Sequence, residues 1–149
     1  MPSTFPLSRV RTATWSLLGL CLALAACSKQ EAPATPYDRI QGKWQLNKVG
    51  SDDNENGQID LLELHPLSSS QNNQIVFNKD GTGLETDTWA GKQPFSLAFK
   101  WQIVKGDSVT LAYAANDTVT YLIAAVSSAA LTLVSNGSIS LEEYYYIKK

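Results

Sequence analysis

A period-two alternation of large apolar residues is the sequence feature that most limits what this chain can fold into. It is clearest where apolar side chains alternate with small or polar ones at Phe95, Leu97, Phe99, Trp101 and Ile103. Successive side chains of a β-strand point to opposite faces, so this pattern predicts a strand with one face buried and one face in water. The fold must therefore place a core on one side of a sheet.

Short turn signals separate similar segments along the rest of the chain. Asp80-Gly81 is typical of a hairpin between segments 74–78 and 83–87, and Lys105-Gly106 precedes an alternating segment at 109–113. Further alternating segments lie at 44–49, 119–123, 131–133 and 144–147. No connection is long enough for a crossover helix. We therefore predict an all-β fold, an antiparallel meander of about eight strands closed into a small β-barrel, because closure removes exposed edges.

Gly42-Lys43-Trp44 opens the first predicted strand and resembles the Gly-x-Trp signature at the start of lipocalins. The hairpin after Phe77, a strand with Trp101 and an aromatic last strand also match. From about residue 40 to 149 the chain resembles the small lipocalin-like lipoproteins of Gram-negative bacteria. This resemblance implies structural roles for Gly42 and Trp44, with Trp44 plugging one end of the barrel. Side chains just fill an eight-stranded barrel, so a filled interior and one holding a ligand both stay open.

The N-terminal segment has the pattern of a signal peptide. Arg9 and Arg11 precede an apolar run at 15–26, shorter than the ~20 residues of a membrane-spanning helix. Leu24-Ala25-Ala26-Cys27 resembles a bacterial lipobox. The resemblance implies cleavage of residues 1–26, lipidation of Cys27 and an acyl anchor in the membrane. Because Ser28 rather than aspartate follows the cysteine, we expect a cell-envelope protein at the outer membrane. The alternative is an uncleaved membrane anchor with a buried cysteine.

The remaining chain divides into a tether and one domain. Residues 27–36 are polar with two prolines, and residues 37–149 have a usual length for a single domain. Cys21 leaves with the signal peptide and Cys27 is lipidated, so the mature domain has neither a free thiol nor a disulfide. Ten basic and fourteen acidic side chains follow residue 26, a net charge of about −4. With no basic run, we do not expect nucleic acid as a partner.

A second pattern lies between the first two predicted strands, from Asp52 to Glu63. It fits the EF-hand loop D-x-[DN]-x-[DN]-G-x5-E, in which alternate side chains direct oxygen ligands at one calcium ion. The ligand positions are Asp52, Asn54, Asn56, Gln58 (through its carbonyl), Asp60 and Glu63. A strand rather than a helix precedes the loop, so the alternative is an acidic, Asn/Gly-rich surface turn. Calcium would be structural there, because no nucleophile or base accompanies it.

Candidate catalytic residues are few. His65 is the single histidine and lies beside Pro66, which indicates a solvated loop residue. Glu142 and Glu143 are adjacent in a predicted strand, so they point to opposite faces and make a poor acid–base pair. We therefore expect no enzymatic activity. The resemblance implies a non-enzymatic envelope lipoprotein with an accessory role or a role in binding a small hydrophobic ligand. The alternative is a protein-binding module, such as an inhibitor or a complex subunit, which a protruding 52–70 loop would favour.

Overall fold

Antiparallel strands make up nearly all of the regular secondary structure in the described chain. The computed structural model describes residues 34–114, 117–136 and 141–149. In chain order its elements are α1 (Pro36–Ile40), β1 (Gly42–Ser51), the 3-10 helix η1 (Leu61–Glu63), β2 (Leu64–Pro66), β3 (Gln71–Phe77), β4 (Thr82–Trp89), β5 (Phe95–Val104), β6 (Ser108–Ala112), β7 (Thr118–Val126), β8 (Ala130–Asn136) and β9 (Leu141–Lys148).

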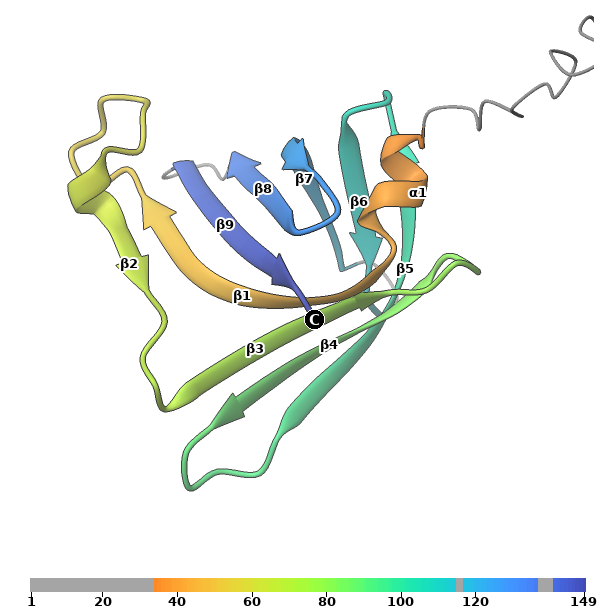
Figure 1. Ribbon diagram of the computed structural model, residues 1–149, viewed down its shortest axis with the longest axis horizontal. Helices are drawn as coiled ribbons and strands as arrows, with labels where there is room; N and C mark the ends of the chain where they lie inside the picture. The colour runs from red at the N-terminus through yellow and green to blue at the C-terminus, as the bar shows by residue number, and fades with distance from the viewer. Residues whose placement is uncertain (1–33, 115–116, 137–140) are drawn as a thin grey trace, which may run out of the picture. The chain divides into compact units, whose positions relative to one another are not determined.

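The strands form one sheet that closes on itself. Their order is β2-β1-β3-β4-β5-β6-β7-β8-β9, and β9 also pairs with β1. All pairings are antiparallel, so β1 and β3 to β9 make an eight-stranded barrel, with β2 added beside β1 (Figure 1). The predicted all-β, antiparallel, lipocalin-like barrel is confirmed. Within the described residues, β2 is a strand that the alternation did not predict.

Two predicted hairpins have the expected turn chemistry. Asp80 Oδ1 accepts a hydrogen bond from the backbone N–H of Thr82 at 3.0 Å, and Gly81 has a φ of +81°. Lys105 and Gly106 both have positive φ values, 55° and 77°, which matches the right-handed twist of the strands that they join. These tight turns bring successive strands into register without a crossover.

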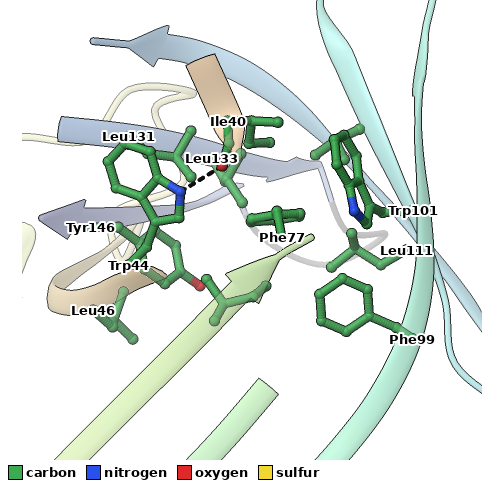
Figure 2. Packing of buried hydrophobic residues seen from close by; sticks show 12 residues of the cluster. Ile40, Trp44, Leu46, Phe77, Phe99, Trp101, Leu111, Leu131, Leu133 and Tyr146 are labelled. Atoms are coloured by element: carbon green, nitrogen blue, oxygen red, sulfur yellow. Dashed lines mark hydrogen bonds between the residues drawn. The ribbon is translucent and has the colours of Figure 1, made fainter. Parts of the chain in front are cut away.

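The core fills the end of the barrel at which α1 lies, here called the closed end. Trp44 is fully buried, and its Nε1 donates a hydrogen bond to the carbonyl of Ile40 at 2.6 Å (Figure 2). Phe77 lies between Trp44 and Trp101, with its ring edge-on to Trp101 at 5.4 Å. Tyr37 of α1 stacks on Trp101 at 4.7 Å. The helix and two tryptophans therefore seal this end.

Residues 34–149 form one compact unit, which holds the described strands and the core. A barrel closed by the β1–β9 pairing has what a domain needs to fold independently of the residues before it. No helix within the described ranges is long and apolar enough to cross a membrane. Cys27, the predicted signal peptide at 1–26 and most of the predicted tether lie outside the described residues, so their roles stay predictions.

Candidate functional site

The barrel wall opens where β5 parts from β6. Residues 100–104 of β5 pair with β6, whereas the described part of the chain gives residues 95–99 a partner on β4 alone. A recess of about 540 Å³ lies at this parting, and Gly83, Phe99 and Tyr113 are among the residues that line it. Figure 1 shows the far ends of β3, β4 and β5 reaching away from β6 to β9. This half of the barrel, away from α1, is here called the open half.

Large apolar side chains line the rim of the open half. Phe95 and Leu97 share the inward face of β5 with the buried Phe99, and Trp89 shares the inward face of β4 with Gly83. Phe95, Leu97 and Trp89 are nevertheless 60%, 42% and 45% exposed. The inward face thus continues past the core as an uncovered apolar surface.

Between the rim and the core, half-buried tyrosines are hydrogen-bonded to carboxylates. The hydroxyl of Tyr113 donates to Glu85 Oε2 at 2.7 Å, and that of Tyr144 donates to Glu142 Oε2 at 2.5 Å. The Tyr121 ring packs edge-on against Tyr144 at 5.7 Å. These five residues are here called the tyrosine–carboxylate belt; they lie on β4, β7 and β9 and, for Tyr113, directly after β6.

The belt tyrosines have raised pKa values, and Tyr113 and Tyr144 act as hydrogen-bond donors. Burial is the main cause that raises the pKa of Tyr113 and of Tyr144, and the neighbouring glutamate raises it further. Burial, followed by the charges of Glu85 and Glu142, raises the pKa of Tyr121 to about 12. Both glutamates therefore favour the neutral, protonated form of Tyr121.

Two further oxygen atoms in the open half have no hydrogen-bond partner. Asn73 on β3 lies directly opposite Asp87 on β4, and both continue the inward faces of their strands. The Oδ1 atoms of both residues are buried and accept no hydrogen bond. An unsatisfied buried acceptor costs ~1–3 kcal/mol, so these positions favour a donor that enters the barrel.

Sequence reasoning did not single out this site, although its signal was present. The same alternation that places Phe99 inside also places Glu85 and Asp87 on the inward face of β4, through Gly83. An acidic residue at an inward position of a predicted barrel is the pattern that would have found it. The alternation gives the face of each residue, but not its distance from the closed end.

The predicted calcium loop is organised by two buried carboxylates. Asp52 accepts hydrogen bonds from the backbone N–H groups of Asn56, at 2.9 Å, and Gly57, at 2.7 Å. Glu63 accepts from the N–H groups of Asn54, at 3.2 Å, and Asp60, at 2.8 Å. The two carboxylates therefore pin both ends of the loop, whose turn uses a φ of +80° at Gly57.

Five of the six predicted calcium ligands are linked by these contacts, and Gln58 joins them by donating its backbone N–H to Asn56 Oδ1 at 2.8 Å. Within the described residues, no three His, Cys, Asp or Glu side chains are grouped so as to hold a metal ion. The carboxylate contacts also account for the loop as a turn, the alternative reading. Calcium binding by Asp52, Asn54, Asn56, Gln58, Asp60 and Glu63 stays a prediction.

If the loop binds calcium, about 10 mM calcium will stabilise residues 28–149 by about 1.4 kcal/mol, given an affinity of about 1 mM. The native mass will rise by about 38 Da, one calcium replacing two protons, and a chelator will reverse both changes. Glu63→Gln should abolish the calcium response, whereas Asp53→Asn, an exposed change in the same loop, should preserve it. A chelator-insensitive mass and melting curve would leave the loop as a surface turn.

Other sequence predictions near this loop have mixed outcomes. The prediction that His65 lies in a loop was wrong. His65 lies on β2, because its segment pairs with β1 in an extended conformation. Its side chain is exposed, with Nε2 3.6 Å from Asp53 Oδ2. Glu142 and Glu143 lie on opposite faces of β9, as predicted. Glu142 accepts a hydrogen bond from the hydroxyl of Tyr144, and Glu143 accepts one from the hydroxyl of Tyr145.

Two solved structures share the architecture of this chain. A lipocalin-like protein from Bacteroides uniformis ATCC 8492 aligns with a TM-score of 0.56 and 15% identity, over 74% of this chain and 99% of that one. An uncharacterized protein from Bacteroides eggerthii DSM 20697 aligns with a TM-score of 0.54 and 14% identity, over 73% and 98%. At these identities the likeness shows the fold alone, a lipocalin-like barrel.

No curated protein matches the sequence. A family model described as a domain of unknown function, DUF5004, matches residues 23–115, which is more than half of the chain. The chain belongs to the DUF5004 family.

Proposed function

We propose that this protein is a non-enzymatic, lipid-anchored protein of the cell envelope that binds a small hydrophobic ligand in the open half of its barrel. The observation that carries the proposal is the uncovered apolar rim formed by Trp89, Phe95 and Leu97 on the inward faces of β4 and β5. The separate recess at the parting of β5 and β6, lined in part by Phe99 and Tyr113, has a volume of about 540 Å³, within the range of small-molecule sites, about 300–1,000 Å³. Covering the rim would remove apolar surface from water at about 25 cal/mol per Å².

The position of α1 fits an anchor upstream of the domain. Ala34, the first described residue, lines a recess with Arg39 of α1 and Lys148 of β9, at the closed end. A tether that joins the domain there leaves the rim at the other end of the barrel accessible. An acylated Cys27 and an accessible open half are therefore compatible.

Binding of the neutral fluorescent probe N-phenyl-1-naphthylamine to residues 28–149 tests the ligand site. Leu97→Ser should weaken probe binding roughly tenfold, because it removes apolar contact area at the rim. Leu122→Ser is the matched control: Leu122 lies on the outward face of β7 and is 45% exposed, against 42% for Leu97. Absence of probe binding, or equal losses in both variants, would contradict the proposed function.

A second candidate is the protein-binding module, which two adjacent leucines favour. Leu61 and Leu62 on η1 are 87% and 94% exposed, and η1 precedes β2, which in the described chain pairs with β1 alone. Exposed leucines beside a sheet edge are a surface for a protein partner. If residues 28–149 bind no probe and purify without a bound organic mass, this becomes the preferred function.

A further inference from the structure

The closed end of the barrel is basic, although the described chain as a whole is acidic. This end consists of α1, the start of β1, the turns 78–81, 105–107 and 127–129, and the chain from the end of β9, because antiparallel strands place alternate turns at one end. Its charged side chains are six basic and three acidic ones: Arg39, Lys43, Lys79, Lys105, Lys148 and Lys149, against Asp38, Asp80 and Asp107. The rest of the described chain has three basic and ten acidic side chains. Positive charge is therefore concentrated at the end that α1 covers.

Arg39 and Lys148 line one recess of about 500 Å³ at this end. Lys148 Nζ donates a hydrogen bond to the Gln41 carbonyl and lies 4.0 Å from the centroid of the Trp44 ring, so its ammonium group is held in place. An ammonium group has three donors, and this contact uses one of them. Burial lowers the pKa of Lys148, because its charged form has lost solvation that an anion would replace. The recess therefore presents a fixed cation together with the exposed guanidinium group of Arg39.

The acidic side chain that lines this recess is already engaged elsewhere. Asp38 Oδ2 accepts hydrogen bonds from the backbone N–H of Thr35, at 3.0 Å, and from the Thr35 hydroxyl, at 2.7 Å. Among the described residues, neither Arg39 nor Lys148 forms an ion pair with a carboxylate. A phosphate group fits these two cations, because its oxygens accept hydrogen bonds from the planar guanidinium fork and from the ammonium group together.

The surroundings of the recess indicate a membrane surface, rather than a free anion, as its occupant. Lys43, Lys79 and Lys105 lie outside the recess, so the positive charge is spread more widely than a single phosphate ion requires. Ala34, which lines the recess, is seven residues from Cys27, a reach of at most about 25 Å. An acyl chain on Cys27 would therefore keep this end close to the lipid headgroups.

We propose that the closed end docks on the membrane surface, with the phosphate of an anionic phospholipid bound between Arg39 and Lys148. The acidic 52–63 loop follows the far end of β1, a ten-residue strand that spans up to ~33 Å, so salt with a Debye length of ~10 Å screens its repulsion. The rim of the open half then faces away from the membrane. The docking rests on the proposed lipid anchor for the nearness of a membrane and is independent of the ligand site.

Flotation of residues 28–149 with lipid vesicles tests the docking without the anchor. The protein should float with phosphatidylcholine vesicles that contain about 30% phosphatidylglycerol and not with pure phosphatidylcholine, and about 0.5 M salt should release it. Arg39→Gln should weaken vesicle binding about fivefold. Lys148→Gln should weaken it at least as much, with urea denaturation as the check that this variant is folded. Lys92→Gln is the matched control, because Lys92 carries the same charge on the exposed turn between β4 and β5, at the other end of the barrel.

The possible outcomes separate the docking from the ligand site and from the anchor. Absence of flotation, equal flotation with pure phosphatidylcholine, or the same loss in Lys92→Gln as in Arg39→Gln would overturn the docking. Release by about 10 mM inorganic phosphate at constant ionic strength would also overturn it, in favour of a free phosphate ion. Leu97→Ser should lose N-phenyl-1-naphthylamine binding and keep vesicle binding, whereas Arg39→Gln should do the reverse. An unlipidated Cys27 would refute the anchor alone, because the floated chain lacks that residue.

Discussion

Trp44→Ala lowers the free energy of unfolding by about 3–5 kcal/mol, the usual loss for a buried tryptophan. The indole is fully buried, donates a hydrogen bond to the Ile40 carbonyl and lies under the Lys148 ammonium group. Truncation leaves a large cavity, an unpaired carbonyl and a cation without its aromatic face. Urea denaturation of residues 28–149 measures the loss, and the melting temperature should fall by roughly 12 °C or more.

The rim supplies a control of the same residue type. Trp89 is 45% exposed, so Trp89→Ala should change the unfolding free energy by about 1 kcal/mol or less. The two variants separate stability from binding, since Trp89→Ala should weaken N-phenyl-1-naphthylamine binding with little effect on folding. Comparable destabilisation by both variants would mean that the rim contributes as much to the stability of the fold as the closed end does.

Strand faces were predictable because alternation is a local property. Phe99 and Trp101 are buried as their spacing requires, and Tyr146 is buried while the ring of Tyr145 contacts Lys48 on the other face. The turn at Asp80-Gly81 was equally predictable, since its geometry depends on two residues. The fold class followed from these elements, as short connections leave few topologies besides an antiparallel meander.

The extra strand and the opening were not predictable, because both depend on pairing between distant segments. β2 is three residues long and ends at Pro66, so it is too short to show an alternation. It forms a strand because it pairs with Lys48, Val49 and Gly50 of β1. The opening arises because β6 ends at Ala112 while β5 extends to Phe95. The sequence alternates through Tyr113, so its apolar pattern does not show where pairing stops.

The site was hidden for a related reason. The belt residues come from three strands and from the position directly after β6, and the contact between Glu85 and Tyr113 joins positions 28 residues apart. That Glu85 and Tyr113 lie close together can be inferred only once the register between β4, β5 and β6 is known. The calcium loop is the opposite case, a pattern within twelve consecutive residues, and its backbone contacts form within that same segment.

Cys27→Ala abolishes lipid labelling of the protein in bacteria supplied with an alkyne analogue of palmitate. Under the proposed anchoring, the Cys27 sulfur and the amine freed by cleavage are the acylated atoms. Two or three chains are needed for stable attachment, since one acyl chain binds a membrane only marginally at about 0.8 kcal/mol per buried methylene. The labelled wild-type protein should have a mass that lacks residues 1–26.

Ser28→Ala is the matched control, because it alters the neighbouring residue without removing the sulfur, and it should be labelled like the wild type. Residues 28–149 exported behind a conventional cleavable signal peptide should appear in the soluble fraction. Retained label in Cys27→Ala would place the lipid elsewhere. An unlabelled wild type that still contains residues 1–26 would instead establish the uncleaved anchor. That result would leave the ligand site intact, because the barrel contains all of its described residues.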